Sequence, residues 1–466
     1  MAGVVILAAA CSDSTGPDSG SMTLSITSGP ATVRQGDVVT YAARTTGGNG
    51  TPAAGPVQWN LAPASAGLIT PGGRFVGYEP GPARVIASAG ALADTVEIVI
   101  QPRGLVPGNF TVVGHGAVDE RFTSDLWLVG TTAYTGTWGQ RLTSAGAANG
   151  DRLYAWDISD PAAPVRTDSV LVNASVVNDI KVREDGTLAV LTHESAPDGL
   201  NGITILDTSS PLHPSVITRF TDEMTAGVHN VWVDGSVVYA VVDGSAPDRG
   251  LRVVDVSSPS SPGILARFFG GTGTGFGEFL HDVYVRDGLA FLSHWNVGLV
   301  ILDVGGGTAG GSPANPVEVG RIRTQGDQTH NAWYWPAMGY VFVGEEDFTT
   351  PGIMHVVDAG DPGNPVEVAT FRVPGQTPHN FWLDEERAIL YLAWYGNGLR
   401  ALDVSGQLLG QLERQGREIA SIMYNGPGGC VDPTGSMTCT WAPQLHDGLV
   451  WVSDMNSGLW ALRPGF

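Results

Sequence analysis

Basic residues are scarce in this chain of 466 residues, because only 24 are lysine or arginine while 46 are aspartate or glutamate. The formal net charge is -22 at pH 7, and Lys181 is the only lysine. An acidic surface repels the phosphate backbones of DNA and RNA, so we exclude nucleic acid as a partner. The same charge attracts cations and favours solubility, but it does not determine the fold.

Cysteine is also rare, and the three present are Cys11, Cys430 and Cys439. Two cysteines alone make a poor metal site. Cys430 and Cys439 flank a short segment that contains glycine and proline, which predicts a local disulfide formed in an oxidising compartment. A pair of free thiols is the alternative.

Several enzyme motifs are missing as well. The sequence contains no Gly-x-Ser-x-Gly elbow, no phosphate-binding loop and no HExxH pair, which excludes the enzyme classes that depend on them. The carboxylates at residues 119–120 and 345–347 lack the ligand spacing of a calcium loop, and we interpret them as exposed. We interpret the glycine-rich segment 270–277 as a flexible loop and not as a nucleotide site.

The apolar run at residues 4–11 is too short to span a membrane, and it ends in small residues and a cysteine. It resembles the lipobox of bacterial lipoproteins, in which the cysteine becomes the acylated first residue. The resemblance implies an exported protein, lipidated at Cys11 and anchored to the membrane on the periplasmic or outer cell surface, with residues 12–21 as a flexible tether. No basic residue precedes the run, so we expect the true start to lie upstream. A cytosolic protein with a chance apolar start is the alternative.

Long amphipathic helices are hard to find, whereas 64 glycines and 30 prolines indicate many short strands joined by turns. Residues 22–103 show period-two patterning, which predicts a β-sandwich with Trp59 in its core. The alternating segments are 22–26, 38–42, 57–61, 83–87 and 95–100. The order Gly36-Asp37, Trp59, Gly72-Gly73 and Pro80–Ala87 resembles bacterial immunoglobulin-like domains, which usually act as spacers.

The rest of the chain repeats one phrase, an apolar strand that ends in aspartate. Its copies are residues 153–157, 203–207, 251–255, 299–303, 354–358, 399–403 and 459–463, the last without the aspartate. Five copies are followed by a Pro-x-x-Pro pair. The pattern resembles the LVIVD repeat family over about 105–466, and the resemblance implies a β-propeller.

Each repeat predicts four short strands. In the fourth copy the first two strands are joined by Asp287-Gly288, a dipeptide typical of a type I′ hairpin turn. We interpret the aspartates that end the third strands as structural acceptors in turns. The last copy lacks an outer strand, and we expect residues 109–114 to supply it. The predicted fold is therefore all-β, a seven-bladed β-propeller at 104–466 preceded by a small immunoglobulin-like β-sandwich.

Two polar positions recur when the copies are aligned on their first hairpins. The first position holds Ser124, Asn178, His229, His281, His330, His379 and Trp441, and the second holds Thr137, His193, Asp243, His294, Glu345, Trp394 and Asp454. Hairpin register predicts that His281 lies opposite His294, and that His330 lies opposite Glu345. By the same register Asn178 faces His193, and Trp441 faces Asp454. We expect the first position to form an arc of imidazoles at one mouth of the central channel.

Two interpretations of this arc remain open. In one, the imidazoles and carboxylates bind a transition metal, copper or zinc, and an open coordination position permits catalysis. The candidate ligands are His193, His229, His281, His294, His330, Glu345 and His379. In the other, a repeated residue serves the repeated architecture by hydrogen bonding to the neighbouring blade.

The functional expectations follow from these two interpretations. The first is a monomeric, lipid-anchored surface protein whose propeller binds or scaffolds a protein or small molecule of unknown identity. The second is an exported metalloenzyme. The sequence contains no complete catalytic constellation, so we favour the binding protein.

Overall fold

The protein is described by a computed structural model that places residues 22–46, 55–105, 108–243, 249–271 and 277–466. The chain divides into two compact units, with the boundary between Pro102 and Arg103. Cys11, the apolar run and the tether lie outside the described residues, as do residues 272–276 of the glycine-rich segment. None of the described helices is long and apolar enough to cross a membrane.

The first unit is built from strands and one short 3-10 helix. Its elements are β1 (Thr23–Ser28), β2 (Thr32–Arg34), β3 (Val38–Thr40), β4 (Ala42–Thr46), β5 (Gln58–Ala62), η1 (Ala64–Ala66), β6 (Gly67–Ile69), β7 (Arg74–Gly77), β8 (Gly81–Ala89) and β9 (Leu92–Gln101). They form three sheets, β1-β4, β2-β9-β8-β5 and β3-β7-β6. Tyr41 and Phe75 are fully buried in the core, while Trp59 is partly buried and packs at its side. The predicted anchor therefore contributes to the core without being its centre.

The second unit is also all-β, and its strands follow the repeat. They are β10 (Phe110–Ala117), β11 (Phe122–Val129), β12 (Thr132–Trp138), β13 (Gln140–Thr143), β14 (Gly146–Asn149), β15 (Arg152–Asp157), β16 (Val165–Leu171), β17 (Ile180–Val182), β18 (Leu188–His193), β19 (Gly202–Asp207), β20 (Ser215–Phe220), β21 (Val228–Asp234), β22 (Val237–Val242), β23 (Gly250–Asp255), β24 (Gly263–Phe268), β25 (Leu280–Arg286), β26 (Leu289–His294), β27 (Gly298–Asp303), β28 (Val317–Ile322), β29 (Thr329–Trp335), β30 (Tyr340–Glu345), β31 (Ile353–Asp358), β32 (Val366–Arg372), β33 (Phe381–Asp384), β34 (Ile389–Ala393), β35 (Leu399–Asp403), β36 (Gly410–Gln411), η2 (Leu412–Arg414), β37 (Glu418–Ile422), β38 (Thr440–His446), β39 (Leu449–Asp454) and β40 (Gly458–Pro464).

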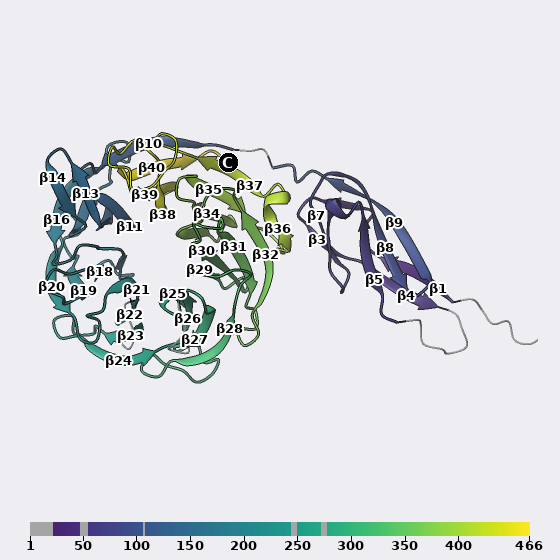
Figure 1. Ribbon diagram of the computed structural model, residues 1–466, viewed down its shortest axis with the longest axis horizontal. Coiled ribbons are helices and arrows are strands. Elements are labelled where there is room, and N and C mark those ends of the chain that lie inside the picture. The colour runs from purple at the N-terminus through teal and green to yellow at the C-terminus, as the bar shows by residue number, and fades with distance from the viewer. Residues whose placement is uncertain (1–21, 47–54, 106–107, 244–248, 272–276) are drawn as a thin grey trace, which may run out of the picture. The chain divides into compact units, whose positions relative to one another are not determined.

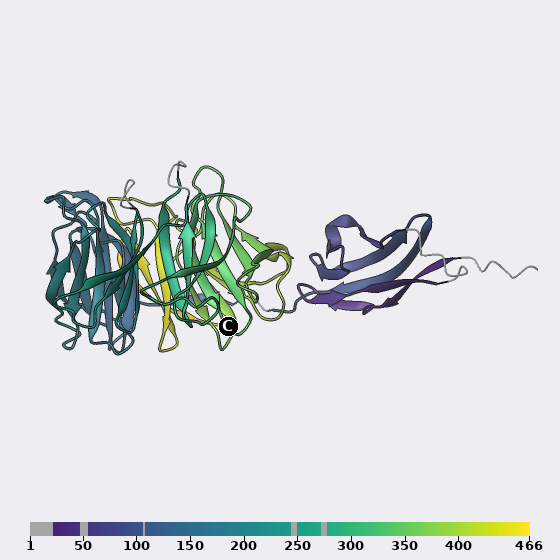
Figure 2. The same cartoon turned by 90° about the horizontal axis from the view of Figure 1, so that it is seen from below.

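These strands form a series of sheets, most of them four-stranded, which are antiparallel except for the parallel pair β32 and β36. The orders are β11-β12-β15-β16, β17-β18-β19-β20, β21-β22-β23-β24, β25-β26-β27-β28, β29-β30-β31-β32-β36, β33-β34-β35-β37 and β10-β40-β39-β38, with β13-β14 as a separate hairpin. The inner strands, defined as β11, β17, β21, β25, β29, β33 and β38, contact one another in that order, and β11 also contacts β38. Figure 1 shows the sheets side by side around a common centre, and Figure 2 shows the same strands from the side.

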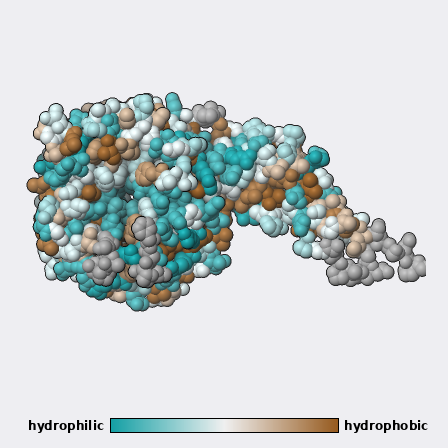
Figure 3. Space-filling model, in the orientation of Figure 1, coloured by the Kyte–Doolittle hydropathy of each residue, from teal (hydrophilic) through white to brown (hydrophobic). Residues whose placement is uncertain are grey.

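The sheets pack face to face through apolar side chains. Leu251 and Val253 of β23, for example, share one buried cluster with Val283 of β25 and Leu292 of β26. Burial of both sheet faces follows from the repeat, because the apolar residues of each third strand alternate between two neighbouring sheets. The face of this unit that Figure 3 presents is mostly hydrophilic.

The turn chemistry follows the sequence. Asp287 and Gly288 have φ values of 53° and 71°, which confirms the left-handed turn expected between β25 and β26. The aspartates that end the third strands each accept a hydrogen bond from the backbone N–H two residues on, as predicted. They are Asp157, Asp207, Asp255, Asp303, Asp358 and Asp403.

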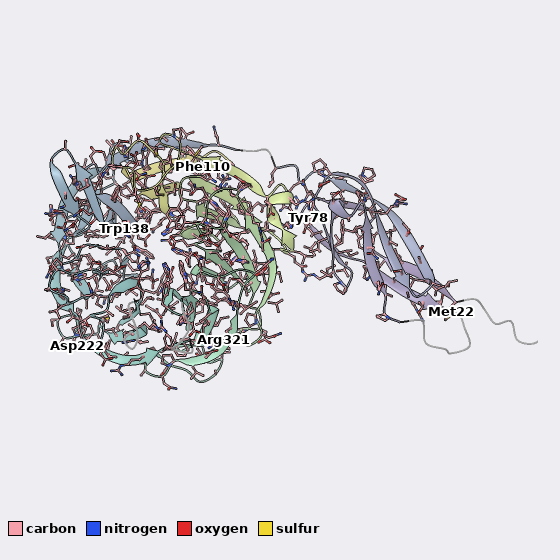
Figure 4. All side chains as sticks on the ribbon, in the orientation of Figure 1. Met22, Tyr78, Phe110, Trp138, Asp222 and Arg321 are labelled. Carbon is pink, nitrogen blue, oxygen red and sulfur yellow. A yellow bond between two sulfur atoms is a disulfide. The ribbon has the colours of Figure 1, made fainter. Side chains whose placement is uncertain are left out.

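The strand predicted to complete the last repeat does so. β10 pairs antiparallel with β40, and Phe110 lies opposite Pro464. Phe110 is labelled beside these strands in Figure 4. The sheet that ends the chain therefore takes its outer strand from the segment that begins the second unit.

The predicted disulfide is also present, and it joins Cys430 to Cys439. Cys439 is buried, and its backbone N–H donates to Asp454 at 2.7 Å. The disulfide thus closes a loop directly beside β38 and β39.

Candidate metal centre

Four imidazoles form a continuous row at the centre of the second unit. The ring centroids of His229 and His281 are 4.3 Å apart, and those of His281 and His330 are 4.4 Å apart. His379 continues the row at 4.4 Å from His330. We call these four residues the histidine arc. The arc lines a small cavity together with Asn178 and other residues of the inner strands.

A β-bulge in each of three inner strands turns three of the four arc residues toward the centre. In β25 the pairing with β26 shifts between Leu280 and Asp282, so that His281 is an extra, unpaired residue. The same shift occurs at His229 in β21 and at His330 in β29. A bulge inserts one residue and re-aims its side chain, which explains why a histidine of a regular alternating strand reaches the cavity.

The bulge makes the predicted cross-strand pairs wrong by one residue. His294 lies opposite Leu280 and not opposite His281, and Glu345 lies opposite Thr329 and not opposite His330. Near the turn the predicted register is correct, since Arg286 pairs with Leu289. The last sheet deviates in the same way, because Asp454 pairs with Thr440, and in the second sheet Glu194 forms an isolated bridge with Val176.

Three of the second-position candidates, His193, His294 and Glu345, consequently do not join the arc, whereas Asp243 does. His193 is buried and hydrogen bonds to Thr204 through Nε2 at 2.7 Å. His294 packs against Phe269, with 5.6 Å between the ring centroids. Glu345 is buried as well, and its Oε1 lies 2.7 Å from Nε2 of His355.

Two of the carboxylates that reach the arc sit one position beyond the predicted residues, while the third, Asp243, is a predicted second-position residue. Glu194 follows His193, and Glu346 follows Glu345, so both carboxylates lie on the opposite face of the strand from the predicted ligands. Asp243 follows Val242, the residue that pairs with Val228 just before the bulge at His229. Side chains alternate between the two faces at the end of the second strand of each sheet, and this alternation could have identified Glu194 and Glu346. It does so only when the position of the bulge in the first strand is known. The expectation that Glu345 and Glu346 are exposed is wrong, because both are largely buried.

Glu346 and two arc residues form a compact three-ligand group. Oε2 of Glu346 lies 3.7 Å from Nε2 of His330 and 4.0 Å from Nε2 of His281. Two ligands of one zinc ion, each at roughly 2 Å from it, are separated by roughly 3 to 4 Å. All three candidate ligand atoms lie within 4.8 Å of one another.

The neighbours of this group orient its ligands. Nδ1 of His281 lies 3.1 Å from the carbonyl oxygen of His330, and since a carbonyl can only accept, this nitrogen carries the proton. Nε2 then presents its lone pair to the space beside Glu346. The hydroxyl of Tyr395 donates to Oε1 of Glu346, so that Oε2 is the oxygen that could bind a metal ion.

The electrostatics keep the imidazoles of this group neutral. Burial, together with the positive charge of His229, holds the pKa of His281 and of His330 well below the ordinary value. Burial also raises the pKa of Glu346 to about 7, although the Tyr395 hydroxyl opposes that shift. Neutral imidazole is the form that binds a metal.

A second group, Glu194, His229 and Asp243, lies next to the first. Oε1 of Glu194 is 2.6 Å and Oδ2 of Asp243 is 3.6 Å from Nδ1 of His229. Burial alone would lower the pKa of His229, but the two carboxylates outweigh it and raise the pKa to about 10. This group is therefore an imidazolium held by two carboxylates, and a proton occupies the nitrogen that a metal would need.

His379 differs from both groups. Its Nδ1 lies 2.6 Å from the carbonyl oxygen of Trp441, and its ring meets that of Tyr395 edge-on at a centroid distance of 4.8 Å. Burial lowers the pKa of His379 to about 4. It extends the arc without joining a three-ligand group among the described residues.

Comparison with known proteins identifies a known repeat in two stretches that contain arc residues. No curated protein sequence matches the chain. A family model described as the LVIVD repeat matches residues 227–268 and 280–324. These stretches contain His229 and His281, each with the strands that carry them. In these two stretches the chain thus carries LVIVD repeats, which is consistent with a repeat protein of the β-propeller type.

Proposed function

We propose that residues 104–466 form a seven-bladed β-propeller, in which each of the sheets is one blade. The contacts of the inner strands and the pairing of β10 with β40 support this proposal. A propeller whose last blade combines strands from both ends of the domain gains a link that holds the ring together. We further propose that the first unit is an immunoglobulin-like spacer.

We propose that this propeller binds one divalent transition metal, zinc or copper, through His281, His330 and Glu346. The observation that carries the proposal is the convergence of two neutral imidazole nitrogens on one carboxylate oxygen at 3.7 and 4.0 Å. These separations are too long for hydrogen bonds but suit ligands that share an ion. Three protein ligands leave a coordination position open, as in catalytic metal sites.

The alternative is a binding or scaffold protein in which the arc is only architectural. The hydrogen bonds from His281 and His379 to carbonyls of the neighbouring sheets favour it. The two roles are compatible, because a histidine that binds a metal usually donates its other N–H to a carbonyl or carboxylate.

We also propose that the protein is exported and held at the cell surface by a lipid on Cys11. The disulfide between Cys430 and Cys439 supports an oxidising compartment. Palmitate labelling of cells that express the full chain, beside a Cys11→Ser variant, tests this part. Equal labelling of the two would overturn it.

Elemental analysis of the purified full chain, after loading with zinc or copper and removal of free metal, tests the metal site. We expect about one metal per chain, and loss of most of it in Glu346→Gln and His330→Ala. His213→Ala is the matched control, because His213 is exposed and pairs with Asp168 on the surface. Circular dichroism checks that each variant is folded. Absence of metal from the parent, or its retention in both variants, would show that the arc is architectural.

A further inference from the structure

A second set of side chains encircles the centre of the same unit. The ring centroids of Trp232 and Tyr284 are 4.6 Å apart, those of Tyr284 and Trp333 are 4.9 Å apart, and those of Trp333 and Trp382 are 5.0 Å apart. Trp127 closes the circuit, at 5.9 Å from Trp232 and 6.1 Å from Trp382. We call these five residues the aromatic collar.

The collar lies further along the inner strands than the histidine arc. Trp232 is three residues beyond His229 in β21, and Trp333 is three residues beyond His330 in β29. Because the bulge adds one residue, this spacing returns the aromatic side chain to the central face of the strand. The arc and the collar therefore occupy successive levels of one channel.

Two cavities meet at the collar. An inner chamber of about 50 Å³ and a wider vestibule of about 420 Å³ are both lined by all five collar residues. The inner chamber also adjoins the cavity below the arc, since the two share Asp125, Asn230 and Asp282. The collar residues therefore line both cavities.

The inner chamber is lined by two carboxyl groups and one ammonium group. Asp125 and Asp282 line it, and the ammonium of Lys181 is the only basic group that does so among the described residues. Lys181 is already committed, because its Nζ lies 2.8 Å from Oδ2 of Asp125 and also contacts Asp179. Asp282 has no basic side chain in direct contact among the ion pairs of the described residues.

The protein itself shows that the collar accepts a cation. Nζ of Lys181 lies 5.3 Å from the ring centroid of Trp127, within the roughly 6 Å reach of a cation–π contact. Among the residues that the structure describes, no cation lies over any other collar ring.

We propose that the collar binds an organic cation, and specifically a quaternary ammonium group of the choline type. Several electron-rich ring faces around one point suit a methylated ammonium, which is weakly hydrated and needs no hydrogen bonds. Asp282 and Asp125 below the rings supply charge complementarity. A sugar would instead need one flat, open aromatic face, whereas neighbouring collar rings are inclined by 38° to 84°.

Titration calorimetry of the full chain with choline and with its neutral isostere 3,3-dimethyl-1-butanol tests the proposal. We expect saturable binding of choline and at least about tenfold weaker binding of the isostere, since only the cation gains the cation–π contacts. Equal affinity for both compounds, or no binding of choline, would overturn the proposal. Binding of cellobiose in place of choline would overturn it in favour of a sugar site.

Two variants locate the site. Trp333→Leu removes a collar face, and Asp282→Asn removes the charge below it with little change of shape. We expect each to weaken choline binding by about tenfold. Trp59→Phe is the matched control, because Trp59 belongs to the other unit. If Trp333→Leu does not fold, Asp282→Asn decides alone, and unchanged affinity in it would contradict the proposal.

The test is independent of the metal site. Choline binding is measured with and without a chelator and in Glu346→Gln. We expect the same affinity in all three, so failure of the metal proposal and failure of the collar proposal give different results.

Discussion

The two ends of the central channel are built from the same inner strands, yet they present opposite chemistry. At the arc, bulged residues supply imidazoles, and the ends of the second strands supply carboxylates. At the collar, regularly paired residues of the same strands supply a circuit of five aromatic rings. The comparison shows that one β-bulge, repeated in several inner strands, allows the same strand to present an imidazole at one level and an aromatic ring at the next.

A polar layer, formed by Asp125, Asp179 and Lys181, lies between the histidine arc and the aromatic collar. Lys181 is buried between Asp125 and Asp179, and these carboxylates raise its pKa above the ordinary value against the effect of burial. Asp179 also accepts from the backbone N–H of Val231 at 2.9 Å. These contacts link β11, β17 and β21 between the level of the histidines and the level of the aromatic rings.

The largest effect is expected from breaking that layer. Lys181→Met leaves two carboxylates buried without their partner, and we expect the free energy of unfolding to fall by about 3–5 kcal/mol. Urea unfolding followed by tryptophan fluorescence measures the change. Arg183→Met, which breaks an exposed pair with Asp185, is the control and should lose less than about 1 kcal/mol. Equal stability of the two variants would show that the layer does not hold the strands.

Glu345 and Glu346 are neighbours at the end of β30, but we expect them to have different roles. Glu345→Gln breaks the buried pair with His355, and we expect a loss of about 1–3 kcal/mol in the free energy of unfolding with no change in bound metal. Glu346→Gln should behave in the opposite way and lose the metal with little loss of stability. The two measurements are urea unfolding and elemental analysis. If Glu345→Gln releases the metal, the bulge-based assignment of the ligands is wrong.

A pH dependence should distinguish the collar from the arc. Burial raises the pKa of Asp282 to about 7, with Asp125 contributing in the same direction and Lys181 opposing it. The ionised form attracts the cation, so choline should bind more weakly at pH 6 and up to about tenfold more tightly at pH 8. Calorimetry at both pH values measures this change. In Asp282→Asn the dependence should vanish, and a dependence that persists would point to another group.

The smallest effect is expected outside both ends. Asp255 accepts a turn hydrogen bond from Ser257 at 2.8 Å and lies at the outer end of β23. Asp255→Ala should lower the melting temperature by about 1–3 °C. Metal content and choline affinity should not change. A change in either would mean that the turn at Asp255 affects the structure of the metal site or of the collar.

Much of the fold was predictable because the repeat is local. Apolar third strands, turn aspartates and the Asp287-Gly288 hairpin are each determined by a few consecutive residues. The exchange of the outer strand was predictable by counting, because the last repeat ended one strand short. The site was less predictable, since residues from four sheets form it and one bulge moves its ligands by a single position.

Sequence alone determined the all-β class, the repeat, the disulfide and the identity of the arc histidines, because each depends on spacing along the chain. Tertiary structure alone decided that Glu194 and Glu346 face the arc while His193, His294 and Glu345 do not. The physical reason is that strand side chains alternate, so one inserted residue exchanges the two faces beyond it. The aromatic collar also depended on the tertiary structure, because its rings are remote in sequence and meet only where the inner strands surround the channel.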